Sequence, residues 1–196
     1  MKQESIHLVY IDDDREEALS AYLDDSYRNE ACDILYDEVS FQGERNYEDL
    51  LQNPVVISAN VILIDSLLFE NDQRLCTGRF SGEEFRMILR KIFPFIEVLV
   101  ISQNGENMDY DIIPKYQSGG AESSTEYYDR VLKTQLDERI ERVRTFRNIS
   151  QKLEFNTGID KFLVEKTMNS LNGITEYDGI SKADVDALIE AFQSLK

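Results

Sequence analysis

Histidine and cysteine are scarce in this sequence. Its 196 residues include one histidine, His7, and two cysteines, Cys32 and Cys76, which lie far apart in the chain. Neither cysteine has a second sulfur or imidazole ligand close to it, so these residues cannot assemble a Cys/His zinc site. We expect both cysteines to be reduced structural thiols and His7 to have a structural role.

Long apolar runs are also lacking. No stretch approaches the roughly 18 consecutive apolar residues that a membrane-spanning helix needs. The first five residues lack the apolar core of a signal peptide. Hydrophobic residues nevertheless make up 42% of the chain and aromatic residues 10%, which is enough for a packed core. We therefore expect a folded, soluble, cytoplasmic protein with no membrane partner.

Basic residues are few in the first part of the chain. Residues 1–122 contain 10 Lys and Arg against 25 Asp and Glu, a net charge of −15, whereas residues 123–196 contain 11 against 13, a net charge of −2. The first part would repel a phosphate backbone. The second part lacks a basic recognition segment. We therefore expect no nucleic-acid partner.

Short apolar runs alternate with helical stripes through the first part of the chain. The runs predict strands at residues 6–11, 34–36, 61–64, 98–101 and 111–115, and the stripes predict helices at residues 15–23, 47–51 and 83–92. Strands that alternate with helices imply right-handed crossovers and a mostly parallel sheet. The fold class is therefore α/β.

A helical extension is predicted after this α/β region. Residues 117–125, Gln-Ser-Gly-Gly-Ala-Glu-Ser-Ser-Thr, look flexible, and we place a domain boundary between residues 122 and 123. Beyond it, apolar residues recur every three or four positions from Tyr128 to Leu153, which predicts one long helix. Two shorter helices follow, near residues 159–168 and 185–195, and a capping-box arrangement at Ser181 opens the last. We expect the extension to mediate a homodimer or to dock onto a protein partner.

Polar residues follow three of the apolar runs at the point where each run ends. Asp12 and Asp13 follow the first run, Asp65 follows the run at residues 61–64, and Ser102 follows the run at residues 98–101. Ligands of parallel α/β sheets bind beyond the carboxyl ends of the strands. These side chains are therefore expected to meet at one rim of the sheet.

The residue types at this rim suit a hard cation and a phosphoryl group. Mg²⁺ prefers oxygen ligands and usually takes one or two carboxylates with waters and phosphate oxygens, and crowded carboxylates need such neutralisation. A third carboxylate can act as a nucleophile and form an acyl phosphate, while a hydroxyl and an ammonium group bind the phosphoryl oxygens. The chain supplies these groups in order as Asp12, Asp13, Asp65, Ser102 and Lys115.

Five segments together match one family pattern. They are Val-Tyr-Ile-Asp-Asp-Asp at residues 9–14, Val-Ile-Leu-Ile-Asp-Ser-Leu-Leu at residues 61–68, Ser-Gly-Glu-Glu-Phe at residues 81–85, Val-Leu-Val-Ile-Ser at residues 98–102 and Ile-Ile-Pro-Lys at residues 112–115. In these segments the chain resembles the receiver domains of bacterial two-component response regulators. The resemblance covers roughly residues 5–122.

The resemblance implies a flavodoxin-like, doubly wound, five-stranded parallel sheet. It implies that Asp12, Asp13 and Asp65 hold Mg²⁺, that Asp65 is phosphorylated, and that Ser102 and Lys115 respond to the phosphoryl group. The partners implied are a histidine kinase or a downstream effector protein. No enzymatic activity is expected beyond autophosphorylation from small phosphodonors and autodephosphorylation.

The chain departs from the family pattern around Asp65 and Lys115. Residues 71–80 form an insertion, Phe69 stands where the family usually has proline, and Pro114 precedes Lys115 where the family places proline after the lysine. The connection between Ser102 and Lys115 is too short for the usual fourth helix. A pseudo-receiver that acts only as a protein interaction module therefore stays open as an alternative.

A phosphatase of the haloacid-dehalogenase type is a further alternative. The pair Asp12 and Asp14 after an apolar strand resembles that family's nucleophile and acid, and Ser102 resembles its second motif. Arg15, however, occupies the place of a small or β-branched residue, and no strand ending in paired aspartates follows Lys115. The receiver-like interpretation fits more of the chain.

Overall fold

Five parallel strands form the centre of the molecule. The computed structural model describes residues 4–41, 47–68, 81–103, 112–155 and 161–171. The strands lie in the order β2-β1-β3-β4-β5 and span Ser5–Asp12 (β1), Asp33–Ser40 (β2), Val61–Asp65 (β3), Glu97–Ser102 (β4) and Ile112–Pro114 (β5). All neighbouring strands pair in parallel. The predicted flavodoxin-like α/β fold is confirmed.

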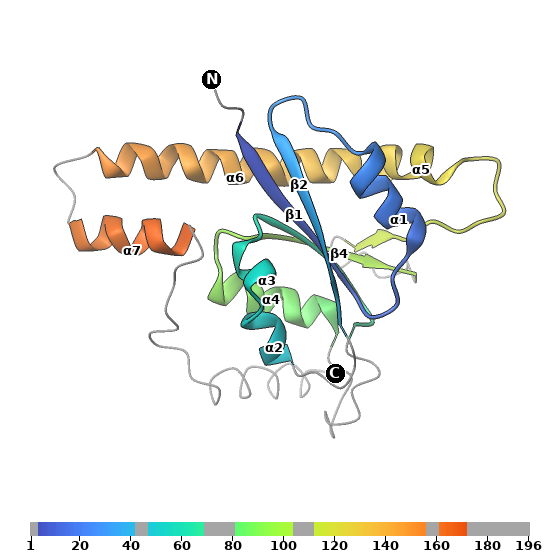
Figure 1. Cartoon of the computed structure of the whole chain (residues 1–196), viewed down its shortest axis with the longest axis horizontal. Helices are drawn as coiled ribbons and strands as arrows, with labels where there is room; N and C mark the ends of the chain where they lie inside the picture. The colour runs from blue at the N-terminus through green and yellow to red at the C-terminus, as the bar shows by residue number, and fades with distance from the viewer. Residues whose placement is uncertain (1–3, 42–46, 69–80, 104–111, 156–160, 172–196) are drawn as a thin grey trace.

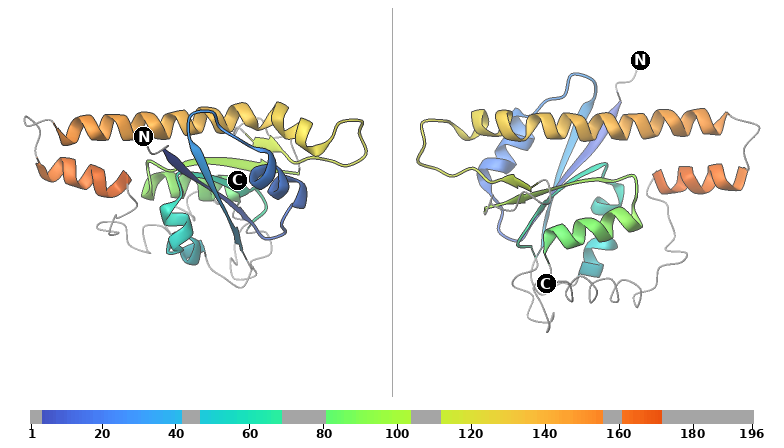
Figure 2. Two further views of the ribbon diagram at one scale, coloured as in Figure 1. Left: turned by 45° about the horizontal axis from the view of Figure 1, so that its top comes forward. Right: turned by 180° about the vertical axis from the view of Figure 1, so that it is seen from behind.

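Helices cover both faces of the sheet (Figures 1 and 2). Near one face lie α1 (Glu17–Ala21), the π-helical turn η1 (Tyr22–Ser26), α5 (Ser124–Val131) and α6 (Lys133–Glu154). The other face is covered by α2 (Tyr47–Leu51), α3 (Pro54–Ser58) and α4 (Gly82–Ile92). The last described helix, α7 (Lys161–Leu171), packs along α6.

The central strands read as unbroken apolar runs because both of their faces are buried. Every residue of β3 and β4 is buried, as expected for a parallel sheet covered on both sides. Alternate residues of β1 face opposite cores, with Val9 and Ile11 in one and Leu8 and Tyr10 in the other. The strands therefore end at one rim with their polar last residues between two hydrophobic layers.

Strand β2 is longer than the predicted segment 34–36. It pairs with β1 along its whole length, from Asp33 opposite Ser5 to Ser40 opposite Asp12. It lies at an edge of the sheet, and most of its residues are at least partly exposed. Because an edge strand tolerates polar side chains, its ends carry little apolar signal.

A short helix, α3, was not predicted. The sequence predicted a helix at residues 47–51 and none directly after it, but the Asn53-Pro54 pair begins a new helix. The Asn53 side chain accepts a hydrogen bond from the Val55 N–H at 2.9 Å. Proline is well tolerated at the first helical position, where its missing N–H has no helical partner.

The long apolar stripe beyond residue 123 forms two helices rather than one. The break lies at Leu132, whose φ of −111° departs from the helical value. Side chains from both helices, and from Leu132 between them, are buried in the core that contains Leu8 and Leu63: Tyr128, Leu132, Leu136, Ile140 and Val143. These helices therefore complete one layer of the α/β fold. The division into units at residues 122 and 123 stays a prediction.

Several predicted features lie outside the described residues. These are the insertion at residues 71–80, Phe69, Cys76, Ser181 and the final helix near residues 185–195. Cys32 is buried, and burial raises the pKa of its thiol. Among the described helices, none has the length and apolar character that crossing a membrane requires.

Candidate functional site

The predicted polar residues meet at the carboxyl ends of the strands. Asp12 is the last residue of β1, Asp65 ends β3, Ser102 ends β4, and Lys115 directly follows β5. Each is between 3% and 7% exposed. The backbone N–H of Lys115 donates to the carbonyl oxygen of Ser102 at 2.8 Å. Four segments distant in the sequence thus end at one rim of the sheet, and the side chains of Asp12, Asp65 and Lys115 form one buried cluster there, called the pocket below.

The Lys115 ammonium group lies between two carboxylates. Its Nζ is 2.9 Å from Asp12 Oδ2 and 2.7 Å from Asp65 Oδ1. Burial works to lower the pKa of Lys115, but the hydrogen bonds with Asp65 and Asp12 outweigh it and raise that pKa. Burial raises the pKa of Asp65, against the opposing effect of Lys115. One positive charge therefore serves two buried negative charges.

The second oxygen of each carboxylate is held by the backbone two residues further on. The Asp14 N–H donates to Asp12 Oδ1 at 3.0 Å, and the Leu67 N–H donates to Asp65 Oδ2 at 2.7 Å. Aspartate commonly forms such turns at the end of an element. They orient both carboxylates so that the remaining oxygens face Lys115.

Asp13 adds a third carboxylate at the solvent side of this pair. Asp12, Asp13 and Asp65 each offer one carboxylate oxygen, and the three oxygens lie within 4.8 Å of one another. A hard divalent cation such as Mg²⁺ takes oxygen ligands of this kind together with waters. The excess of buried negative charge over the single Lys115 ammonium would be reduced by such a cation, so the donor set fits Mg²⁺.

Sequence reasoning missed a hydroxyl group beside the pocket. The Ser66 hydroxyl donates to the Ser102 Oγ at 2.7 Å, and both side chains are buried. The Ser66 N–H donates to the Ile101 carbonyl oxygen at 2.9 Å. Its position directly after Asp65 was the available signal, because the residue after a strand end can reach the neighbouring strand.

Tyr10 and Glu16 also contact the pocket and were not predicted. The Tyr10 hydroxyl donates to Asp12 Oδ2, and its pKa is raised by burial and by the Asp12 charge. Tyr10 precedes Asp12 by two positions, so both side chains lie on the same face of β1. Glu16 contacts Tyr128 of α5, a partner that no local pattern in the sequence reveals.

A glycine allows helix α4 to approach the Asp65 loop. A Cβ atom at Gly82 would lie 2.1 Å from the carbonyl oxygen of Asp65. The Gly82 N–H donates to the Ser66 carbonyl oxygen at 2.9 Å. Just before it, Ser81 caps the helix in a capping box with Glu84. The start of α4 therefore fixes the backbone that carries Asp65.

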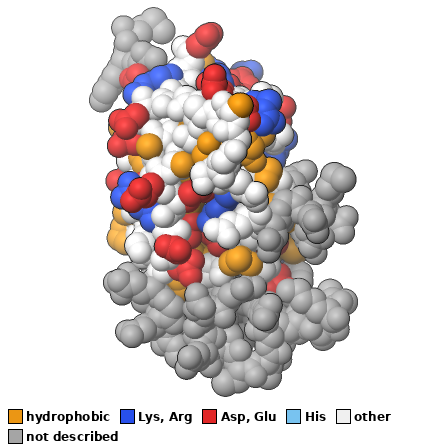
Figure 3. Space-filling model, turned by 90° about the vertical axis from the view of Figure 1, so that its right-hand side faces the viewer, with side chains coloured by type: hydrophobic (Ala, Val, Ile, Leu, Met, Phe, Trp, Pro, Cys, Tyr) orange, Lys and Arg blue, Asp and Glu red, His pale blue; other side chains and the backbone are white. Residues whose placement is uncertain are grey.

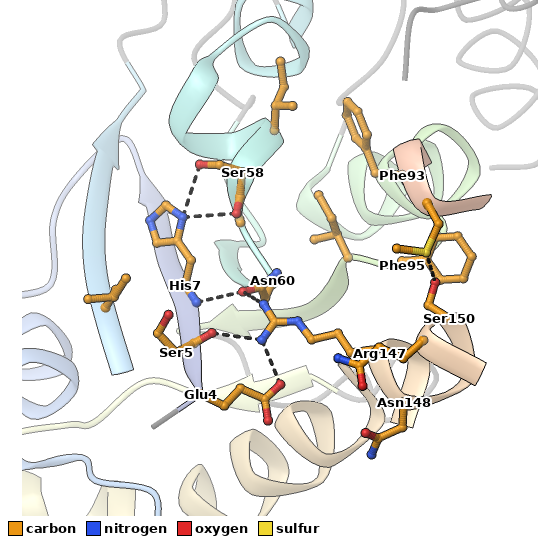
Figure 4. Close-up of a pocket in the computed structure, with 16 residues that line it drawn as sticks. Glu4, Ser5, His7, Ser58, Asn60, Phe93, Phe95, Arg147, Asn148 and Ser150 are labelled. Carbon is orange, nitrogen blue, oxygen red and sulfur yellow. Dashed lines mark hydrogen bonds and ion pairs between the residues drawn. The ribbon is translucent and has the colours of Figure 1, made fainter. Parts of the chain in front are cut away.

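A cavity of about 660 Å³ lies at the amino ends of the strands, away from this pocket (Figure 4). At its wall, the Arg147 guanidinium donates to Glu4 Oε1 and to Asn60 Oδ1, each at 2.9 Å. The His7 ring lies 2.8 Å from Asp37 and also contacts Ser58 of α3. These charged groups pair with one another, so they favour a structural role for this end of the sheet.

The outer surface near α1 and α5 carries both signs of charge. On the face shown in Figure 3, acidic and basic side chains lie intermixed, with hydrophobic side chains scattered between them. Arg130, for example, pairs with Glu122, and Lys133 pairs with Asp137. Asp12 and Asp65 of the candidate site, in contrast, are buried.

Comparison of the chain with protein-family models, with curated proteins and with solved structures found no match.

Proposed function

We propose that this protein is a receiver-like signalling protein that accepts a phosphoryl group on Asp65 in the presence of Mg²⁺. The observation that supports this most strongly is the placement of Lys115 between Asp12 and Asp65, with the Asp13 carboxylate close by. This set of groups offers a nucleophile, a fixed positive charge and a cation site. We further propose that the protein works in the cytoplasm.

The phosphoryl step uses groups that the chain itself supplies. A carboxylate oxygen of Asp65 attacks the phosphorus atom of a phosphodonor, and a new P–O bond forms. The bond between phosphorus and the leaving oxygen breaks, and that oxygen keeps the electron pair; with acetyl phosphate the product is acetate. Lys115 counters the charge that remains on the phosphoryl oxygens. The step requires no proton transfer at Asp65.

The remaining residues would bind the cation and orient the phosphoryl group. Asp12, Asp13 and Asp65 would hold Mg²⁺, which supplies charge neutralisation for the transferring phosphoryl group. Ser66 directly follows Asp65, and its hydroxyl is hydrogen bonded to that of Ser102 at the end of the neighbouring strand β4. We propose that this pair of hydroxyl groups donates a hydrogen bond to a phosphoryl oxygen.

The proposed output is a change in protein–protein contacts. Helices α5 and α6 are the elements that join the pocket side of the sheet to the C-terminal region, since Tyr128 and Leu132 are buried against it. The proposed partner is a histidine kinase or a downstream effector, or a second copy of the chain that binds through the helical region. Phosphorylation of Asp65 would alter how this region is presented.

Intact-protein mass spectrometry after incubation with acetyl phosphate and Mg²⁺ tests this proposal. We expect one added phosphoryl group on the wild-type chain, none on Asp65→Asn, and none when a chelator removes Mg²⁺. Asp24→Asn is the matched control, because Asp24 is an exposed carboxylate of η1 outside the pocket. Incorporation into Asp65→Asn at the wild-type level would overturn the proposal.

A pseudo-receiver is the second candidate function. Lys115 already pairs with both Asp12 and Asp65, so the chain provides its own cation for these carboxylates. A folded wild-type protein that gains no phosphoryl group and binds no Mg²⁺ would support this reading. The phosphatase alternative has less support, because Asp14, its expected acid, is exposed while Asp12 is buried.

A further inference from the structure

A series of polar groups leads from the acidic pocket to the start of α1. Asp12 Oδ2 accepts hydrogen bonds from the Lys115 ammonium and from the Tyr10 hydroxyl. The backbone of Glu16 also acts on the Tyr10 hydroxyl and works to lower its pKa, against the larger effects of burial and of Asp12. The position of Glu16 is therefore tied to the carboxylate that shares Lys115 with Asp65.

The same series continues into α5 and returns to the pocket. Glu16 Oε1 accepts a hydrogen bond from the Tyr128 hydroxyl at 2.6 Å, across 112 positions of sequence. The Tyr128 oxygen accepts a hydrogen bond from the Tyr116 N–H at 3.1 Å. Tyr116 is the residue next to Lys115, so this second route joins Glu16 to the backbone of the pocket, and we call these contacts the ring.

Glu16 responds to the charge of the pocket without being one of its clustered ligands. Its Oε2 is buried and has no hydrogen-bond partner in the part of the chain that the structure describes. Burial raises the pKa of Glu16, the Tyr128 hydrogen bond opposes this, and the charges of Lys115, Asp12 and Asp65 also act on it. A change of charge in the pocket therefore changes the strength of the Glu16–Tyr128 contact.

Tyr128 is placed to carry such a change into the helical region. Its side chain is fully buried, and it belongs to α5, which leads directly into α6. A second tyrosine, Tyr22, also reaches α5 by donating to Asp129 at 2.9 Å. That contact lies outside the ring, because Asp129 bonds to no member of it. The two tyrosines therefore allow a matched comparison.

We propose that Tyr128 is a positioning residue of the pocket. Through its hydrogen bonds with Glu16 and with Tyr116, the neighbour of Lys115, it links the Asp12–Lys115 pair to helix α5. Binding of a charged species in the pocket then changes the local stability of α5, which hydrogen exchange measures. This inference rests on the proposed function, which identifies the species that binds in the pocket. The ring itself is a property of the unloaded chain.

Hydrogen exchange of residues 124–131 in the full chain measures this coupling, with Mg²⁺ alone as the probe. We expect Mg²⁺ to change the exchange rate of α5 in the wild type by about fivefold, the factor that one ordinary hydrogen bond contributes. In Tyr128→Phe and Glu16→Gln the change should vanish, although calorimetry still detects Mg²⁺ binding. Tyr22→Phe should keep the wild-type response. A purely structural role of Tyr128 would alter the starting rate and leave the Mg²⁺ response intact.

A double-mutant cycle in Mg²⁺-free buffer separates this inference from the proposed function. Asp12→Asn and Tyr128→Phe are combined, and α5 exchange is measured for both single variants and the double variant. Non-additive effects with no Mg²⁺ response in the wild type would support the ring and reject the Mg²⁺-dependent function. Additive effects would overturn the inference, whatever Mg²⁺ does. If Tyr128→Phe does not fold, Glu16→Gln takes its place in the cycle.

Discussion

Lys115 Nζ lies 2.7 Å from Asp65 Oδ1 and pairs on its other side with Asp12, so one ammonium group serves two buried carboxylates. Buried ions are costly to remove from water, and their attraction offsets this cost only when each has a partner. The pocket therefore depends on Lys115 for stability and holds an excess of negative charge that a divalent cation would reduce. Both consequences can be measured.

Replacement of Lys115 by methionine should destabilise the fold in the absence of Mg²⁺. The change leaves Asp12 and Asp65 buried without their ammonium partner, which costs about 3–5 kcal/mol in comparable cases. Urea denaturation at pH 7 gives the free energy of unfolding. Mg²⁺ should restore part of the loss, because it supplies positive charge to the same carboxylates.

Lys133→Met is the matched control for this substitution. Lys133 pairs with Asp137 at a half-exposed position, 3.4 Å away. Such a pair contributes less than about 1 kcal/mol. Equal losses of unfolding free energy in Lys115→Met and Lys133→Met would contradict the prediction, because Lys115 would then contribute no more to stability than a half-exposed lysine.

Asp65 and Glu4 should affect the pH dependence of stability in opposite directions. Burial raises the pKa of Asp65 above its ordinary value of 3.8, so the folded protein retains a proton that the unfolded chain releases. Ionisation of Asp65 therefore destabilises the fold as pH rises from about 4 through the folded pKa. For Glu4, burial works to raise the pKa from 4.5, but hydrogen bonds from Arg147 and Arg144 outweigh it and lower the pKa. Ionised Glu4 therefore stabilises the fold at neutral pH, and this contribution is lost on acidification.

Two isosteric variants in chelator-containing buffer test these signs. Asp65→Asn should raise the free energy of unfolding at pH 7, and Glu4→Gln should lower it. The Asp65→Asn difference should shrink as pH falls from the raised folded pKa of Asp65 toward 3.8. The Glu4→Gln difference should begin to shrink only below about pH 4.5 and disappear below the lowered folded pKa of Glu4. Thermal melts of the three proteins across this pH range give the comparison. A lower stability of Asp65→Asn at pH 7 would contradict the assignment of Asp65 as a group whose charge is unfavourable in the fold.

The central part of the fold could be predicted because burial on both faces leaves a strong signal. The strands β3 and β4 each carry an unbroken apolar run. β3 begins where it was predicted and ends one residue later, and β4 is one residue longer than predicted at each end. The edge strand β2 and the short helix α3 gave weak signals. Polar side chains are tolerated at a sheet edge, and the pair Asn53-Pro54 is compatible with both a helix end and a helix start. The stripe from Tyr128 onward predicted a helix, but periodicity does not say what a helix packs against.

Some residues of the candidate site could likewise be predicted from the sequence, and others could not. Asp12, Asp13 and Asp65 could be placed together because the carboxyl ends of parallel strands share a rim. Ser66 and Tyr10 could be found from their positions beside Asp65 and Asp12. Contacts such as Glu16 with Tyr128 depend on where a distant helix lies in space, so no spacing in the sequence encodes them.

Gly82→Ala should displace the backbone that carries Asp65. The added Cβ would lie 2.1 Å from the Asp65 carbonyl oxygen, so either α4 or the Asp65 loop must move. A backbone shift of this kind costs about 1–3 kcal/mol. Phosphorylation by acetyl phosphate should slow at the same time. Gly120→Ala is the control, because the nearest atom to its added Cβ is 3.9 Å away. Wild-type stability and phosphorylation in Gly82→Ala would show that the approach of α4 is not required.

Leu136→Ala tests whether α6 belongs to the α/β core or to a separate helical unit. Leu136 is fully buried in the cluster that also contains Leu8 and Leu63. Its truncation should therefore destabilise the whole α/β domain by about 2–5 kcal/mol. Ile149 lies further along the same helix and is 49% exposed, so Ile149→Ala should change stability by no more than about 0.5 kcal/mol. Hydrogen exchange of β1 and β3 provides the decisive readout, since the central strands gain exchange only if α6 supports them. If Leu136→Ala melts α6 while β1 and β3 keep their protection, residues 123–196 form a unit of their own and the boundary predicted at residues 122 and 123 is correct.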